Sequence, residues 1–184
     1  MTANAALPDT SIFGGYIVIS PGNGAEAVHV PYAGLKGNYQ SIPVLTPTQY
    51  GFPWLAQAVG NSLFNRPNGA TYTLQNGDIP YFLLHLDHHA AWLRMEVFEA
   101  NASKKWQVGY YEEHLPRNST STSYFAFPWD GLTVNGARGQ SNKTNVLPNG
   151  QYIVKVTVLK ALGKESNPGD TETWASPVIT LARP

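Results

Sequence analysis

The chain has no cysteine and little charge: its 184 residues include 12 Lys+Arg and 12 Asp+Glu, for a formal net charge of zero. The absence of cysteine excludes a disulfide framework, thiolate metal sites and thiol catalysis. No run of Lys or Arg supplies the basic surface that nucleic-acid binding needs. No window approaches the ~18 apolar residues of a membrane span. We therefore expect neither a nucleic-acid nor a membrane partner.

The residues that are abundant are turn formers and aromatics, with 17 Gly, 14 Pro and an aromatic content of 12%. The length is sufficient to bury a real hydrophobic core. No stretch sustains an apolar period of 3.6 residues over the ~10–12 residues of an average helix. This composition and the missing helical period predict an all-β protein.

The strand patterns are clearest in the C-terminal two thirds. Pro80–Asp87 is apolar nearly throughout, as in a strand buried on both faces, and Trp92–Ala100 alternates apolar with polar residues. Gln151–Leu162 places Tyr152, Val154, Val156 and Val158 on one face. About seven such strands from residue 71 onward predict a two-sheet β-sandwich over residues 71–184.

The N-terminal part is expected to be a separate hairpin. Gly15–Ser20 and Ala27–Tyr32 are strand-like and flank the turn at Pro21–Gly24. We assign residues 1–37 to this hairpin and residues 38–70, rich in Pro, Gly, Asn and Thr, to a long irregular connection with a short helical turn near Pro53–Val59. Because the hairpin strands are strongly apolar, we expect them to pack on the sandwich or on a second copy.

Two sets of motifs resemble a known family. Gly15-Tyr16-Ile17 followed by Val28–Gly37 looks like the last strands of the fibronectin III-like domain that follows the catalytic domain in large secreted subtilisin-like serine proteases. The second set is similar to a pattern that recurs in Ig/fibronectin-like domains, including the C-terminal domain of these proteases: Phe127-Pro128-Trp129-Asp130-Gly131 followed by Leu147–Val156. The stretch Pro80–Pro184 resembles the C-terminal end of fungal subtilases of the minor extracellular protease type, and the two motif sets together span roughly residues 13–184.

The resemblance implies a secreted, fibronectin III/Ig-like β-sandwich with the hairpin as the remnant of a preceding domain. Its role would be to stabilise a protease or to aid recognition of a protein substrate, so the expected partners are a subtilase catalytic domain or a protein substrate. A homodimer formed by strand exchange is a further possibility. The alternative is an independent secreted fungal binding protein, a lectin or an immunomodulatory protein, with glycans as partners.

Catalysis is not expected. A subtilase needs separate segments that carry Asp, His and Ser, and the sequence shows no such segments, no G-x-S-x-G elbow, no phosphate loop and no dinucleotide fingerprint. The sequence therefore predicts neither an enzyme nor a cofactor. Residues Met1–Ser11 lack the apolar segment of a signal peptide, so we expect any export signal to lie outside this chain or to have been removed.

Three groups of residues are candidate sites. His85, Asp87 and His89 would share one face of a strand and could hold Zn²⁺, as a metal-dependent hydrolase would require, although a turn explains them better and no metal is predicted. Tyr50, Trp54 and Trp106 could form a sugar-stacking surface or serve as half-buried loop anchors. Asn101, Asn118 and Asn142 begin N-x-[ST] sequons, which arise either by chance or as glycosylated surface loops.

Overall fold

The computed structural model describes residues 3–22, 24–101, 105–136, 138 and 143–184, and the side chains of Lys105 and Trp106 are not described. The chain divides into two compact units, Met1–Ile42 and Pro43–Pro184. Among the described residues no helix is long and apolar enough to cross a membrane.

The first unit is an antiparallel ribbon. Strand β1 (Ile12–Ile19) pairs with β2 (Val28–Leu35) over eight rungs, from Ile12–Leu35 to Ile19–Val28, and a single 3-10 turn, η1 (Tyr39–Ser41), follows. The two strands form a sheet of their own. The hairpin predicted from the sequence is therefore present, and its strands are longer than the pattern indicated.

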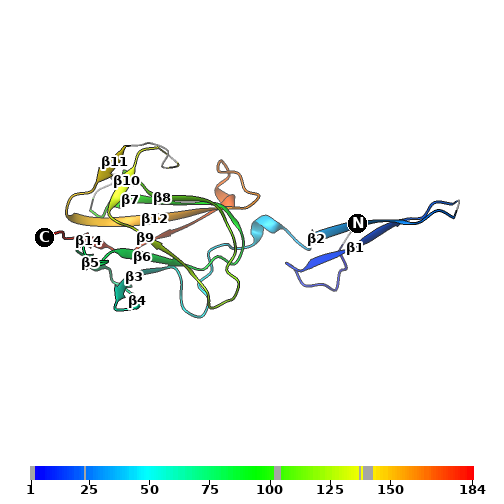
Figure 1. Ribbon diagram of the computed structural model, residues 1–184, viewed down its shortest axis with the longest axis horizontal. Helices are drawn as coiled ribbons and strands as arrows, with labels where there is room; N and C mark the ends of the chain where they lie inside the picture. Colours follow the sequence, from blue (N-terminus) through cyan, green and yellow to red (C-terminus); the bar gives the residue numbers. More distant parts are fainter. Residues whose placement is uncertain (1–2, 23, 102–104, 137, 139–142) are drawn as a thin grey trace. The chain divides into compact units, whose positions relative to one another are not determined.

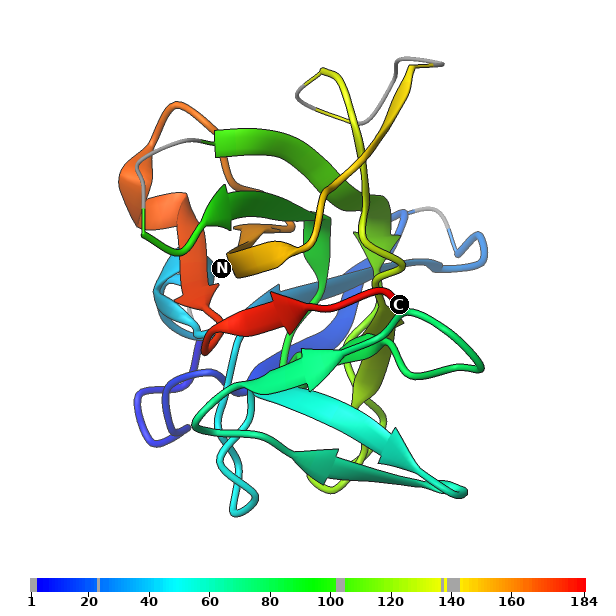
Figure 2. The same ribbon diagram turned by 90° about the vertical axis from the view of Figure 1, so that its left-hand side faces the viewer.

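The second unit is a β-sandwich (Figures 1 and 2). Its larger sheet has the order β11-β10-β8-β7-β12-β14-β5, with β13 also paired to β12. These strands are β5 (Ala70–Tyr72), β7 (Ala90–Glu99), β8 (Lys105–Leu115), β10 (Leu132–Val134), β11 (Thr144–Val146), β12 (Gly150–Lys160), β13 (Thr171–Ala175) and β14 (Ile179–Leu181). A second 3-10 turn, η2 (Pro168–Asp170), precedes β13.

The smaller sheet has the order β4-β3-β6-β9. Its strands are β3 (Trp54–Val59), β4 (Ser62–Asn65), β6 (Pro80–Leu84) and β9 (Phe125–Pro128). All the pairs within this sheet are antiparallel, whereas β14 and β5 of the larger sheet run parallel. Figure 1 shows β7, β8 and β12 of the larger sheet on one side of the sandwich and β3, β6 and β9 of the smaller sheet on the other.

The core lies between the sheets, and β12 illustrates why. Its residues Tyr152, Val154, Val156 and Val158 are buried, as the period-2 alternation predicted. The indole ring of Trp129 meets the ring of Tyr152 edge-on, with centroids 6.4 Å apart. The small sheet contributes Leu55, Phe82 and Phe127 to the same cluster. The sequence-predicted all-β sandwich is thus confirmed, while its fibronectin III-like character remains a prediction.

The segment expected to be irregular contains two strands. β3 and β4 form a hairpin within residues 38–70, so the helical turn predicted near Pro53–Val59 is wrong. Both faces of β3 are covered: Leu55 faces the main core, and Ala56 belongs to a second apolar cluster with Phe52 and Leu83. A strand buried on both faces shows no polar–apolar alternation, which is why the sequence pattern did not reveal it.

Candidate functional site

The strongest candidate site lies in the sandwich and is built by three segments: residues 46–54, 85–87 and 121–124. The first feature of this site is an aromatic cluster, defined here as Tyr50, Phe52, Trp54 and Tyr124. The ring centroid of Phe52 lies 6.0 Å from that of Tyr50, 4.9 Å from Trp54 and 5.5 Å from Tyr124. Phe52 is only 4% exposed, whereas Tyr50 and Tyr124 are each 44% exposed. The cluster is therefore a buried ring flanked by two accessible ones.

Local hydrogen bonds hold these rings in place. The Phe52 amide donates to the Pro47 carbonyl at 2.8 Å and closes the loop that carries Tyr50. Trp54 Nε1 donates to the Tyr50 carbonyl at 2.9 Å. Trp54 begins β3 opposite Leu83 of β6, and Tyr124 directly precedes β9, which pairs with the other side of β6. The order β3-β6-β9 thus brings the two segments together.

The second feature is an open hollow of about 390 Å³, called here the His85 pocket. Its lining residues are Thr46, Thr48, Gln49, His85, Asp87 and Ser121. His85 is 3% exposed, and its Nδ1 lies 2.7 Å from the Ser123 carbonyl. Because a carbonyl can only accept, Nδ1 carries the proton and Nε2 is left as an acceptor in neutral histidine. Nε2 lies 3.8 Å from Asp87 Oδ1.

The pocket contains a serine, a histidine and an aspartate, but their arrangement differs from that of a catalytic triad. In a triad the carboxylate accepts from histidine Nδ1 and the serine hydroxyl donates to Nε2. Here His85 Nδ1 is hydrogen-bonded to the Ser123 carbonyl, and Asp87 lies on the Nε2 side of the ring. The His85–Asp87 pair therefore does not prepare Ser121 as a nucleophile. Both residues of this pair line the pocket.

The three metal candidates are not brought together. His85 and Asp87 line the same pocket, but His89 lines a different hollow, together with His114. β6 ends at Leu84, so the strand alternation assumed for His85, Asp87 and His89 does not extend through them. Within the described part of the chain, no group of three or more His, Cys, Asp or Glu side chains could hold a metal ion.

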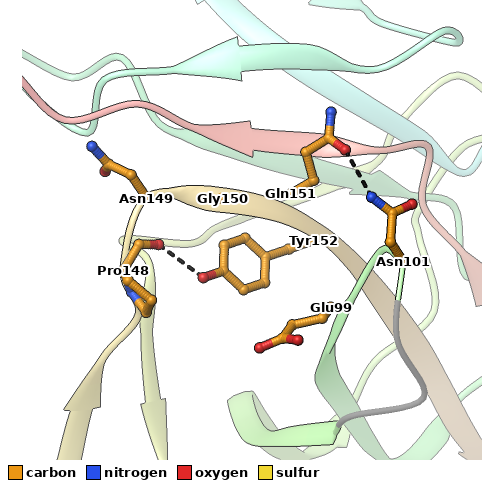
Figure 3. Close-up of a pocket in the computed structure, with 7 residues that line it drawn as sticks. All are labelled: Glu99, Asn101, Pro148, Asn149, Gly150, Gln151 and Tyr152. Carbon is orange, nitrogen blue, oxygen red and sulfur yellow. Dashed lines mark hydrogen bonds between the residues drawn. The ribbon is translucent and has the colours of Figure 1, made fainter.

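A further hollow of about 330 Å³ lies at the start of β12 (Figure 3). Its lining residues are Glu99, Asn101, Pro148, Asn149, Gly150, Gln151 and Tyr152. The Tyr152 hydroxyl donates to the Pro148 carbonyl at 2.8 Å, and Asn101 Nδ2 donates to Gln151 Oε1 at 3.3 Å. Burial raises the pKa of Tyr152, and the Glu99 charge adds to this effect. These two hydrogen bonds join lining residues to one another, so the groups that make them already have partners within the protein.

The remaining sequence candidates are dispersed. Asn101 is exposed, but Asn118 is buried, and its Oδ1 accepts from the Leu86 amide at 2.7 Å. Asn142 lies outside the described residues, and Trp106 is described only as part of the β8 backbone. Tyr124 was not identified from the sequence, because it joins Tyr50 and Trp54 only through the pairing of distant strands.

No protein-family model matches the chain, and no curated protein matches it. The relation to subtilisin-like proteases therefore stays a prediction that depends on the motifs alone.

Proposed function

We propose that the chain is a non-catalytic β-sandwich module that recognises extended protein substrates as part of a secreted system of the subtilisin-like kind it resembles. The observation that carries this proposal is the aromatic cluster, with its two accessible tyrosines, built by the same segments as the His85 pocket.

This combination suits an extended polypeptide. Exposed aromatic rings provide a large apolar contact area with few rotatable bonds, so little conformational entropy is lost when a ligand's side chain packs on them. The neighbouring pocket supplies acceptors for backbone N–H groups, namely His85 Nε2 and the Asp87 carboxylate, and hydroxyl groups for carbonyls. Apolar area with a few fixed polar groups is the usual composition of a binding site.

Binding of the full chain to immobilised β-casein, an unfolded protein, tests the proposal. Tyr50→Ala and Tyr124→Ala should each weaken binding about tenfold, equivalent to ~1.4 kcal/mol. Phe64→Ala is the matched control, because Phe64 is an exposed aromatic residue on β4, outside the cluster. The casein should also remain uncleaved. Absence of binding, or equal losses for all three variants, would contradict the proposed function.

A second candidate is glycan binding at the same cluster, favoured by the accessible rings of Tyr50 and Tyr124, since aromatic faces pack on pyranose rings. The same variants separate the two candidates when they are assayed on immobilised chitin and yeast β-glucan. Binding to a polysaccharide but not to casein, lost in Tyr50→Ala, would establish the lectin alternative instead.

A further inference from the structure

Within its own unit, residues 1–42, the ribbon of β1 and β2 leaves an apolar surface uncovered. Its exposed large side chains are Ile12, Tyr16, Ile17, Val18, Ile19, Val28 and Val30, between 41% and 82% exposed. A sheet of only two strands is marginally stable in water, and its outer edges are free to pair with another strand. The ribbon has two such edges, the outer edge of β1 and the outer edge of β2.

The position of Pro31 identifies the edge. Pro31 faces Tyr16 across the ribbon and has no N–H, so this rung belongs to the non-hydrogen-bonded set. The Lys36 amide donates to the Ser11 carbonyl at 2.9 Å, so the rung next to Ile12–Leu35 is hydrogen-bonded. Counting alternate rungs from this bond also makes the Tyr16–Pro31 rung non-hydrogen-bonded. The main-chain groups of Ile12, Gly14, Tyr16 and Val18 therefore point outward from β1 as an uninterrupted row. The outer edge of β2 lacks a donor at Pro31, in its middle.

The glycines of the ribbon show how its faces are filled. A Cβ atom on Gly34 would lie 2.7 Å from the Phe13 ring, and one on Gly15 would lie 3.0 Å from the Tyr32 hydroxyl. Each of these glycines is thus covered by an aromatic ring from the opposite strand. Gly14 differs, because the nearest atoms to its Cβ position belong to backbone. Its aromatic neighbour on the same face and the same edge is Tyr16, two residues along β1.

We infer that the partner of β1 is β1 of a second copy, antiparallel, with the two-fold axis at Gly15. In this register Gly14 of each copy faces Tyr16 of the other, which repeats the glycine–aromatic pairing found inside the ribbon. Ile12 then faces Val18, and Phe13 faces Ile17. β1 carries no charged residue, so no like charges meet across the axis.

The same register limits the assembly to two copies. The four strands run β2-β1-β1-β2, and both outer edges carry Pro31, which interrupts the row of donors. Further copies are therefore disfavoured, and the product is a closed dimer rather than a fibre.

Sedimentation of the full chain over a concentration series tests this inference with a matched pair of variants. Val18 and His29 occupy one rung and point their amides to opposite edges. A proline restricts the residue before it to extended backbone. Ile17 and Val28, which precede the two substituted positions, already have this conformation in β1 and β2, so both variants are compatible with the ribbon. The wild type and His29→Pro should reach twice the chain mass, whereas Val18→Pro should stay monomeric. A wild type that remains monomeric throughout, or identical behaviour of the two variants, would overturn the inference.

A cysteine variant keeps the test independent of the folding of Val18→Pro. The chain has no cysteine, so Gly15→Cys introduces one thiol on the proposed axis. The Cβ atoms of the two facing cysteines would be ~4.5–5.5 Å apart. A disulfide needs a slightly shorter Cβ–Cβ distance, so a small movement of the two strands toward each other would allow it to form. A Tyr32 shift of a few tenths of an ångström makes room for the new Cβ. Glutathione buffer should give a disulfide dimer with Gly15→Cys but not with Val30→Cys on β2, and the reverse result would contradict the register.

Discussion

The carboxylate of Glu172 holds the main chain at Val44, 128 residues earlier in the sequence: the Val44 amide donates to Oε1 and Oε2 at 2.9 and 3.0 Å. The Leu45 amide donates to the same carboxylate at 2.8 Å. Lys160 Nζ lies 3.4 Å away, and its side chain is nearly buried. β13 thus anchors the segment that leads into the Thr46–Trp54 loop of the candidate site.

Glu172→Gln should lower the free energy of unfolding by about 2–4 kcal/mol, because it weakens the bonds from two amides and removes the charge that faces Lys160. The control is Glu165→Gln, which removes a carboxylate paired with Arg94 on the surface and should cost less than about 1 kcal/mol. Urea denaturation measures both. Equal losses would show that Glu172 is not an anchor.

Gly69→Ala should destabilise the sandwich strongly, by about 3 kcal/mol or more. Gly69 has a positive φ of 85°, and a Cβ there would lie 2.2 Å from the Val178 carbonyl oxygen, beside the parallel pair of β5 and β14. Gly77→Ala is the control for backbone strain alone, since Gly77 has a φ of 82° and no atom within 4 Å of its Cβ position, so the difference between the two variants gives the steric part. That control should cost only about 1 kcal/mol. Thermal melts that place both variants at the same midpoint would contradict the clash.

Asp78 should make the sandwich sensitive to acid. Burial tends to raise the pKa of Asp78, but hydrogen bonds from Gln57 and from the amide and hydroxyl of Thr73 outweigh it, so the net pKa lies below the ordinary value. A carboxyl whose pKa is lowered by folding stabilises the protein above its unfolded-state pKa and loses this contribution as the pH falls through the folded-state pKa. Unfolding free energies between pH 7 and pH 2.5 should fall less steeply at the acidic end in Asp78→Asn than in the wild type. If the unfolding free energies of the two proteins fall in parallel with pH, the Asp78 carboxylate does not contribute to the acid sensitivity.

The sequons should differ in use. A glycan requires an accessible Asn Nδ2, and Asn101 is exposed, whereas Asn118 is only 8% exposed and its Oδ1 caps the Leu86 amide. Glycopeptide mass spectrometry of the chain secreted from a eukaryotic host should find sugar at Asn101 and none at Asn118. Asn118→Ala should lower the unfolding free energy by about 1–3 kcal/mol. Full occupancy of Asn118 in folded protein would contradict the buried placement.

The features that the sequence predicted well are those with a simple period. The alternation in Tyr152–Val158 predicted the buried face of β12, and the apolar runs around Pro21–Gly24 predicted the ribbon. β3 was missed because Leu55 and Ala56 are covered on opposite faces, so no alternation is visible.

The site was predicted only in part, because it depends on strand order. Tyr50 and Trp54 are close in sequence and were candidates from the start, but Tyr124 joins them through β6 and β9. The metal hypothesis assumed a strand through His89, whereas β6 ends at Leu84 and the chain then turns. Local patterns do not encode such pairings between distant segments.

Titration of the ¹⁵N-labelled full chain with unlabelled β-casein, followed by NMR, tests the central claim most directly. If the aromatic cluster and the His85 pocket bind extended protein, the shift changes will concentrate at the Tyr50 and Tyr124 amides, the Trp54 indole N–H and His85. Changes confined to the hollow around Glu99 and Tyr152, or no change at saturating casein, would contradict the claim.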